Sequence, residues 1–197
     1  MKRYWLVFGL AVVIFSGEIV GGILSGSLAL FSDAGHVLTD LVAVVVAIVV
    51  ESSVVRNPIQ EGRYRGLGAF INGALLIIVA ALIALEAFER MLVRREILTG
   101  TMIGVAIFGA FGNYLQHRVL GASHSRHLTH QGMSLHVLSD FWQSIAVIAA
   151  GVLIAATGHH IFDLVASGLI ASLMLLWGIR LILLGRLSYD RATGHEP

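Results

Sequence analysis

Long apolar runs separated by short polar breaks make up almost the whole chain. The runs lie at about residues 4–24, 28–55, 67–89, 97–120, 132–157 and 161–184. A helix needs about 20 mostly apolar residues to cross the hydrocarbon core of a bilayer. Lipid admits only helices and closed barrels, because every backbone amide must be paired within the protein. The continuous runs therefore predict an all-α integral membrane protein, a six-transmembrane-helix bundle.

This pattern assigns residues 1–187 to one transmembrane domain and residues 188–197 to a short cytoplasmic tail. Cytoplasmic loops of membrane proteins are enriched in Lys and Arg. With six spans the two termini share a side, and that side collects ten Lys and Arg residues, against three in the loop after the third span. We therefore expect the N- and C-termini to be cytoplasmic.

The composition supports a membrane protein and limits the side chains that could bind a metal. Hydrophobic residues make up 57% of the chain and charged residues only 13%, whereas soluble domains carry roughly 25% charged residues. There are no cysteines, so any metal site must use imidazole and carboxylate ligands. The formal net charge of +1 gives no argument for a nucleic-acid partner.

A short motif occurs twice inside the apolar runs. Residues 36–40 read His-Val-Leu-Thr-Asp, and residues 136–140 read His-Val-Leu-Ser-Asp. Residues four apart share one helix face, so each segment presents an imidazole and a carboxylate one turn apart. The second and fifth spans run in opposite directions in a six-span bundle, and the two motifs fall at similar depths. We expect them to meet.

Ionisable side chains inside a membrane are costly and are usually functional. Two neutral imidazoles and two carboxylates around Zn²⁺ form a neutral tetrahedral site, and zinc accepts nitrogen and oxygen ligands in that geometry. We therefore predict a metal site at His36, Asp40, His136 and Asp140, with zinc favoured and Fe²⁺, Co²⁺, Cd²⁺ or Mn²⁺ also compatible. The alternative is two unrelated His–Asp ion pairs that join helices.

Four further polar residues are candidates for orienting the ligands or for an access path: Asp33, Glu18, Gln143 and Ser144. Helix contacts would explain Gln143 and Ser144 equally well. For Asp33, capping of its helix and an exit path are competing roles. Close packing beside Gly21 and Gly22 is the first interpretation of Glu18, and a proton relay is the second.

The break between the fourth and fifth spans is rich in histidine, with His124, His127 and His130. Such a tract is only compositional evidence for metal binding. It fits either a weak cytoplasmic loop that collects zinc or a polar linker.

Several stretches of the sequence resemble a known family of membrane proteins. The run from Glu18 to Asp40, with Ser-Asp-Ala-Gly-His at 32–36, closely resembles the first two spans of the cation diffusion facilitator family. Residues 136–140 resemble its fifth span, and residues 71–76 and 86–90 its third. Asp163 matches an acidic position in its sixth span. The resemblance implies a homodimer that exports Zn²⁺ in exchange for protons through the four motif residues.

The resemblance also sets expectations where the sequence departs from the family. Members usually continue into a cytoplasmic ferredoxin-like domain that binds metal, whereas here the sequence stops soon after the sixth span. We expect no C-terminal metal-sensing domain. Zinc is expected as the transported substrate, no cofactor is expected, and the compact chain favours a bacterial inner membrane.

The sequence also bears on functions other than transport. An intramembrane zinc protease would need a His-Glu-x-x-His motif, which the sequence lacks, so we do not expect an enzyme. Four protein ligands would also leave no open position on zinc for a substrate water. A non-transporting subunit that dimerises with a full-length relative remains the other alternative.

Overall fold

The protein is described by a computed structural model that covers residues 2–93, 95–121 and 128–193. Side chains are described for residues 5–93, 95–120 and 136–193. These parts of the chain form six α-helices and one 3-10 turn: α1 Lys2–Ser25, α2 Leu28–Arg56, η1 Pro58–Gln60, α3 Glu61–Leu92, α4 Thr99–Gly121, α5 Leu128–Thr157 and α6 Ile161–Thr193.

The helices confirm the all-helical prediction and extend several of the expected runs. α3 begins at Glu61 instead of about 67, and α6 continues to Thr193 instead of ending at about 184. Both extensions are polar, so an apolar pattern could not reveal them. Ion pairs one turn apart support them, between Arg65 and Glu61 at 2.8 Å and between Arg186 and Asp190 at 3.6 Å.

Five of the described helices are long and apolar enough to cross a membrane, and α4 is not among them. The lower hydropathy of α4 has a structural reason. Its amide side chains Asn113 and Gln116 are each only 3% exposed, so they face the interior of the bundle. Phe108 and Phe111 of the same helix are exposed. α4 therefore presents an apolar outer surface although its overall composition is mixed.

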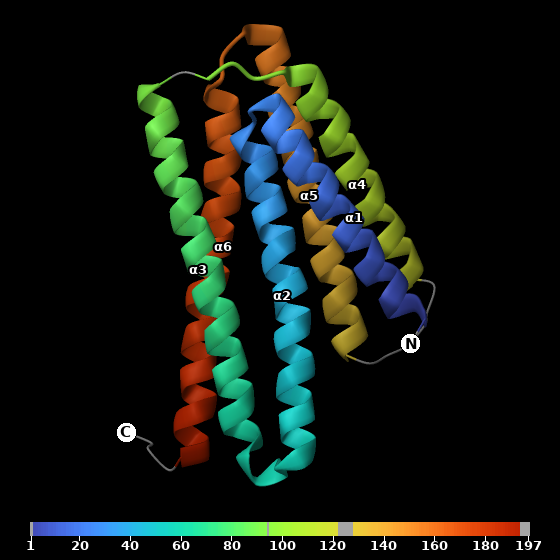
Figure 1. Ribbon diagram of the computed structural model, residues 1–197, viewed down its shortest axis with the longest axis vertical. Helices are drawn as coiled ribbons and strands as arrows, with labels where there is room; N and C mark the ends of the chain where they lie inside the picture. The colour runs from blue at the N-terminus through green and yellow to red at the C-terminus, as the bar shows by residue number, and fades with distance from the viewer. Residues whose placement is uncertain (1, 94, 122–127, 194–197) are drawn as a thin grey trace.

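The helices form two groups joined by α2 (Figure 1). α3 and α6 lie side by side along most of their length, and α1, α4 and α5 form the other group. Glycines allow α3 and α6 to approach so closely. A methyl group on Gly73 would lie 2.6 Å from the Gly178 carbonyl oxygen, and one on Gly66 would lie 2.6 Å from that of Gly185. The two backbones are therefore in direct contact.

Gly73→Ala is expected to destabilise the protein by about 1–3 kcal/mol, because the added carbon meets backbone that has no room to move. Thermal unfolding of the purified protein in detergent measures this. Gly168→Ala is the matched control, since that α6 glycine has open space where its Cβ would be. Equal stability of the two variants would show that α3 and α6 are not packed through these glycines.

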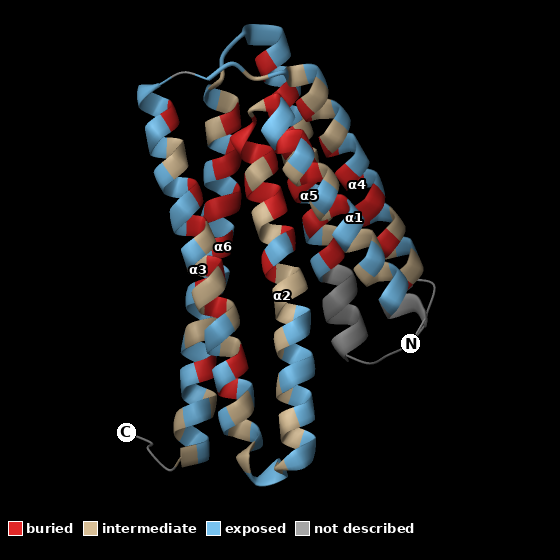
Figure 2. Ribbon diagram, viewed as in Figure 1, coloured by how far each residue is buried: buried red, intermediate tan, exposed pale blue. Residues whose placement is uncertain are grey.

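The bundle is tightly packed at one end and open at the other. We call the end where α2 begins the closed end, and the end where α1 begins and α6 ends the open end (Figure 1). In α2 the buried residues all lie between Leu28 and Thr39, and none follows in the rest of the helix. Figure 2 shows the same gradient, with buried positions concentrated around the beginning of α2. The described core is thus assembled at the closed end.

Candidate metal centre

The two repeated motifs lie on α2 and α5, which run in opposite directions (Figure 1). Each histidine falls in the third turn of its helix, and each aspartate lies one turn further on. Thr39 donates its hydroxyl proton to the backbone carbonyl of His36 at 2.7 Å. This local bond gives the hydroxyl proton an acceptor, so Thr39 can lie buried inside the bundle.

The structure brings all four motif residues together. One ligand atom from each of His36, Asp40, His136 and Asp140 lies within 4.8 Å of the other three. His36 Nε2 is 3.7 Å from Asp40 and 3.3 Å from Asp140. His136 Nε2 is 3.1 Å from Asp40 and 3.9 Å from Asp140. Each imidazole therefore contacts both carboxylates, one on its own helix and one across the helix pair.

These distances match the size of a zinc coordination shell. Four ligands placed 2.0–2.1 Å from Zn²⁺ in a tetrahedron are about 3.3 Å apart. The four nitrogen–oxygen distances range from 3.1 to 3.9 Å. Two unrelated ion pairs would need no contacts between the pairs, but His36–Asp140 and His136–Asp40 are the two shortest of the four. The arrangement is a single four-residue cluster.

Two cavities reach this cluster, one on each side of α2. The larger, about 630 Å³, lies between α2, α3, α5 and α6, and Asn72 and Trp177 are among its lining residues. The smaller, about 360 Å³, lies between α1, α2, α4 and α5. Asp40 and His136 line both. Most of the other residues that line the smaller cavity, such as Val7, Val44 and Gln116, come from the open-end halves of their helices, so this cavity extends from the cluster toward the open end.

The four additional polar candidates lie on the closed side of the cluster or against the larger cavity. Ser144 donates to Asp33 Oδ2 at 3.2 Å. Asp33 is not a helix cap, because Ser27 is the N-cap of α2. Glu18 and Asp33 are both fully buried. Gln143 lines the larger cavity.

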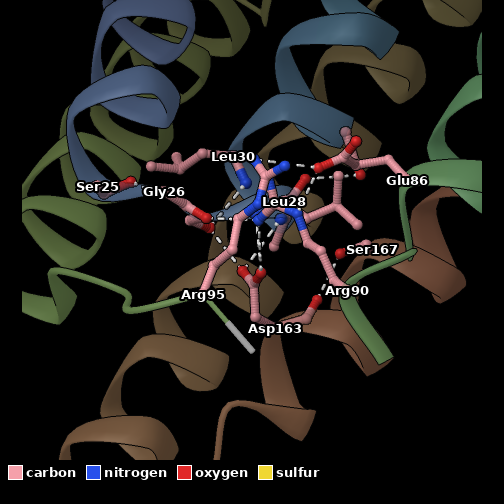
Figure 3. A network of polar contacts seen from close by, with 12 residues as sticks. Ser25, Gly26, Leu28, Leu30, Glu86, Arg90, Arg95, Asp163 and Ser167 are labelled. Atoms are coloured by element: carbon pink, nitrogen blue, oxygen red, sulfur yellow. Dashed lines mark hydrogen bonds and ion pairs between the residues drawn. The ribbon is translucent and has the colours of Figure 1, made fainter. Parts of the chain in front are cut away.

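A second polar network closes the end of the bundle where α2 begins (Figure 3). The Asp163 carboxylate of α6 accepts hydrogen bonds from the Ser27 hydroxyl at 2.6 Å, from the Leu28 amide at 2.8 Å and from the Ala29 amide at 3.1 Å. The first amides of a helix have no partner within it, and negative charge is favourable there. A carboxylate from α6 thus caps the helix that carries His36 and Asp40.

Arg90 of α3 completes this network, which we call the Asp163 clamp (Ser27, Glu86, Arg90 and Asp163). Its guanidinium donates to the Gly26 carbonyl and lies 3.9 Å from Asp163. Glu86 accepts from Arg90 at 2.8 Å. Gly26 has a φ of 71°, which allows the tight turn between α1 and α2. The clamp therefore ties that turn to both α3 and α6.

The clamp also explains why arginines occur in the loop after the third span, on the side of the membrane that carries few basic residues. Arg90 lies in α3 and its side chain is only 7% exposed, so it is a buried structural charge. Arg95 lies 3.5 Å from Glu86. Arg94 lies outside the described residues. Both described arginines have acidic partners. They are therefore weak evidence against placing this loop on the outer side of the membrane.

Sequence reasoning missed two features of the site region. Asn113 of α4 donates to Ser144 Oγ at 3.4 Å, and an amide inside an apolar run is the signal that could have revealed it. Asp163 was noted only as a matching family position, and its capping role depends on which helix end it meets. The long separation between Asp163 and Ser27 gives no sequence signal for that contact.

Only part of the histidine-rich segment lies within the described residues. His124 and His127 lie outside the described residues, and His130 falls in the first turn of α5, in a stretch whose side chains are not described. The expected loop over 121–131 is therefore shorter, because α5 begins at Leu128. The choice between a zinc-collecting loop and a linker stays a prediction.

The fold and the cluster define a class: a multi-pass helical membrane protein with two His and two Asp side chains gathered between two of its helices, Asp140 buried and His136 exposed. The chain belongs to the cation efflux family, whose transmembrane domain matches residues 4–185. This match confirms the resemblance seen in the motifs.

Named relatives are similar over most of this chain. This chain is 34% identical to the zinc transporter ZitB of Escherichia coli (strain K12), and the match covers 92% of this chain. It is 34% identical to a cadmium, cobalt and zinc/H(+)-K(+) antiporter of Bacillus subtilis over 80%, and 36% identical to the metal cation efflux system protein CzcD of Cupriavidus metallidurans over 81%. The matches cover 60%, 53% and 51% of these relatives' lengths.

Proposed function

We propose that the chain exports a divalent metal ion, with zinc as the favoured substrate, in exchange for protons. The transport site in this proposal is His36, Asp40, His136 and Asp140. The observation that carries it is the set of four nitrogen–oxygen distances of 3.1–3.9 Å, two of which, His36–Asp140 and His136–Asp40, link α2 to α5. Relatives named as zinc transporters and as an antiporter support both the substrate and the exchange.

Zinc is favoured by the chemistry of the ligand set. Two imidazoles and two carboxylates match the N and O ligands of Zn²⁺ and give a neutral complex. Mg²⁺ and Ca²⁺ prefer shells made of oxygen alone. Cadmium and cobalt, which the Bacillus relative's name includes, and Fe²⁺ or Mn²⁺ remain alternative substrates, because similar ligands bind them.

The proposed topology has six spans, with both termini in the cytoplasm of a bacterial cell and the bundle in its inner membrane. Three observations support it. α1 begins and α6 ends at the same end (Figure 1), most Lys and Arg residues belong to that end, and α4 has an apolar outer surface. The smaller cavity then extends toward the cytoplasm, which is the side from which an exporter loads its substrate.

Alternating access follows from this arrangement. With the open end facing the cytoplasm, zinc enters along the smaller cavity and binds between α2 and α5. Closure of the open end and separation of the closed end would then release it outside. We also propose the homodimer that the family resemblance implies, which cross-linking of the purified protein in membranes would test.

The deciding experiment is zinc uptake by the purified chain alone in liposomes that carry a proton gradient. Uptake that stops when a protonophore collapses the gradient supports antiport. Uptake only in the presence of a longer relative would instead support a role as a subunit. The same assay with Cd²⁺, Co²⁺, Fe²⁺ and Mn²⁺ ranks the alternative substrates.

Zinc binding should weaken as the pH falls. Histidine binds metal only as a neutral imidazole, so protons compete with zinc for the same atoms. At pH values where the free ligands carry protons, each proton that zinc must displace is expected to lower the apparent zinc affinity about tenfold for every pH unit of acidification. Isothermal titration of the detergent-purified protein over a range of pH measures this. An affinity that does not change with pH would contradict histidine ligation.

A further inference from the structure

Two acidic side chains lie deep in the bundle on the closed side of the metal centre. Glu18 of α1 and Asp33 of α2 are each 0% exposed. Asp33 precedes His36 by about one helical turn on α2. Neither acid lines either of the two cavities that reach the metal centre. The pair is therefore separate from both cavities, and Asp33 lies between the metal centre and the closed end.

The two carboxyl groups are held against each other by α4 and α5. Both lie near the same hydroxyl group, that of Ser144 on α5. Ser144 of α5 donates to Asp33 Oδ2 at 3.2 Å. On α4, Gly109 leaves space for the Glu18 carboxyl group: a methyl group there would lie 2.6 Å from Glu18 Oε1 and 3.4 Å from Ser144 Oγ.

The pair has more acceptor atoms than donors. Among the described residues, both oxygens of Glu18 and Oδ1 of Asp33 have no hydrogen-bond donor. The charged side chains that act on the pair are Asp140 and His36. Two ionised carboxylates in contact, away from water, repel each other strongly and lack solvation. One proton shared between them removes the repulsion and supplies the missing donor.

We propose that Glu18 and Asp33 hold one proton between them in this state, and that they form a proton-carrying site separate from the four metal ligands. The carrying role rests on the proposed function. When the closed end opens, the pair takes up a proton from the outer side. When zinc binds one turn away in the state seen here, its charge repels that proton, which leaves toward the open end.

Infrared spectroscopy tests the shared proton without any transport assay. A protonated carboxyl group has a C=O stretching band that an ionised carboxylate lacks. We expect this band in the metal-free wild-type protein at neutral pH. Glu18→Gln should change or remove it, whereas Glu51→Gln, at an exposed acid paired with Arg65, should leave it unchanged. Absence of the band in the wild type would overturn the proposal, whether or not the chain transports zinc.

Two further measurements test the carrying role. Adding zinc to the wild-type protein should reduce the band, and a band that persists with zinc bound would refute proton release. In liposomes containing a pH-sensitive dye, Glu18→Gln should keep zinc–zinc exchange but lose about one proton per zinc moved. A purely structural role would lower exchange and proton movement together. Asp33→Asn provides the second variant, with the same expectations.

Discussion

Asp40→Ala or Asp140→Ala is expected to abolish proton-driven zinc uptake into everted membrane vesicles while the protein still accumulates in the membrane. Each aspartate contacts both histidines of the cluster. Removing one leaves three ligands and an uncompensated positive charge when Zn²⁺ binds. Replacing partners that only orient metal ligands already costs 10–100-fold in affinity, so loss of a ligand should exceed about 100-fold.

The control for these variants is Asp190→Ala. Asp190 lies near the end of α6 and pairs with Arg186, whose side chain is 79% exposed, so its loss should leave uptake unchanged. Full uptake by either Asp40→Ala or Asp140→Ala would refute the site. Loss of uptake accompanied by loss of the protein from the membrane would point to folding instead, which quantitative immunoblotting separates from a transport defect.

Asp163→Ala is expected to cause the largest loss of stability among single changes at the closed end, about 3–5 kcal/mol. The substitution removes the buried acceptor of the Ser27 hydroxyl and of the Leu28 and Ala29 amides, and it removes one of the two carboxylates near Arg90, which keeps Glu86. Since these amides begin the helix that carries half of the metal centre, zinc affinity should also fall. Thermal unfolding and zinc titration of the same preparation measure both effects.

A double-mutant cycle tests whether this loss comes from the clamp. If Asp163 and Arg90 act together, Arg90→Leu combined with Asp163→Ala should destabilise less than the sum of the two single changes. Asp163→Asn, which keeps one acceptor oxygen, should be intermediate. Additive effects would mean that the carboxylate stabilises α2 independently of Arg90.

Much of the architecture was predictable because lipid imposes strong constraints on sequence. Apolar runs of sufficient length located the six helices, and two identical ligand spacings predicted that α2 and α5 meet. The polar ends of α3 and α6 were missed because ion pairs such as Arg65–Glu61, not apolar composition, maintain helix there.

Contacts between distant segments were harder to predict. The Gly73–Gly178 approach requires knowing which two helices pair, although the seven-residue spacing of the glycines in each helix is visible in the sequence. The Asp163 clamp joins the beginnings of α2 and α6 to the last turns of α3, and local sequence does not encode that meeting. The acid pair likewise depends on the space that Gly109 leaves in a third helix.

The division of the proposed metal centre between two antiparallel helices makes it sensitive to sliding of one helix along the other. All four ligand atoms lie within 4.8 Å of each other, whereas one helical turn advances 5.4 Å along its axis. A shift of α2 along α5 by only half a turn, about 2.7 Å, would separate the His36–Asp140 and His136–Asp40 contacts beyond coordination distance. If the four residues are the transport site we propose, such a small displacement would leave two weak two-ligand fragments, and metal release would require no unfolding of either helix.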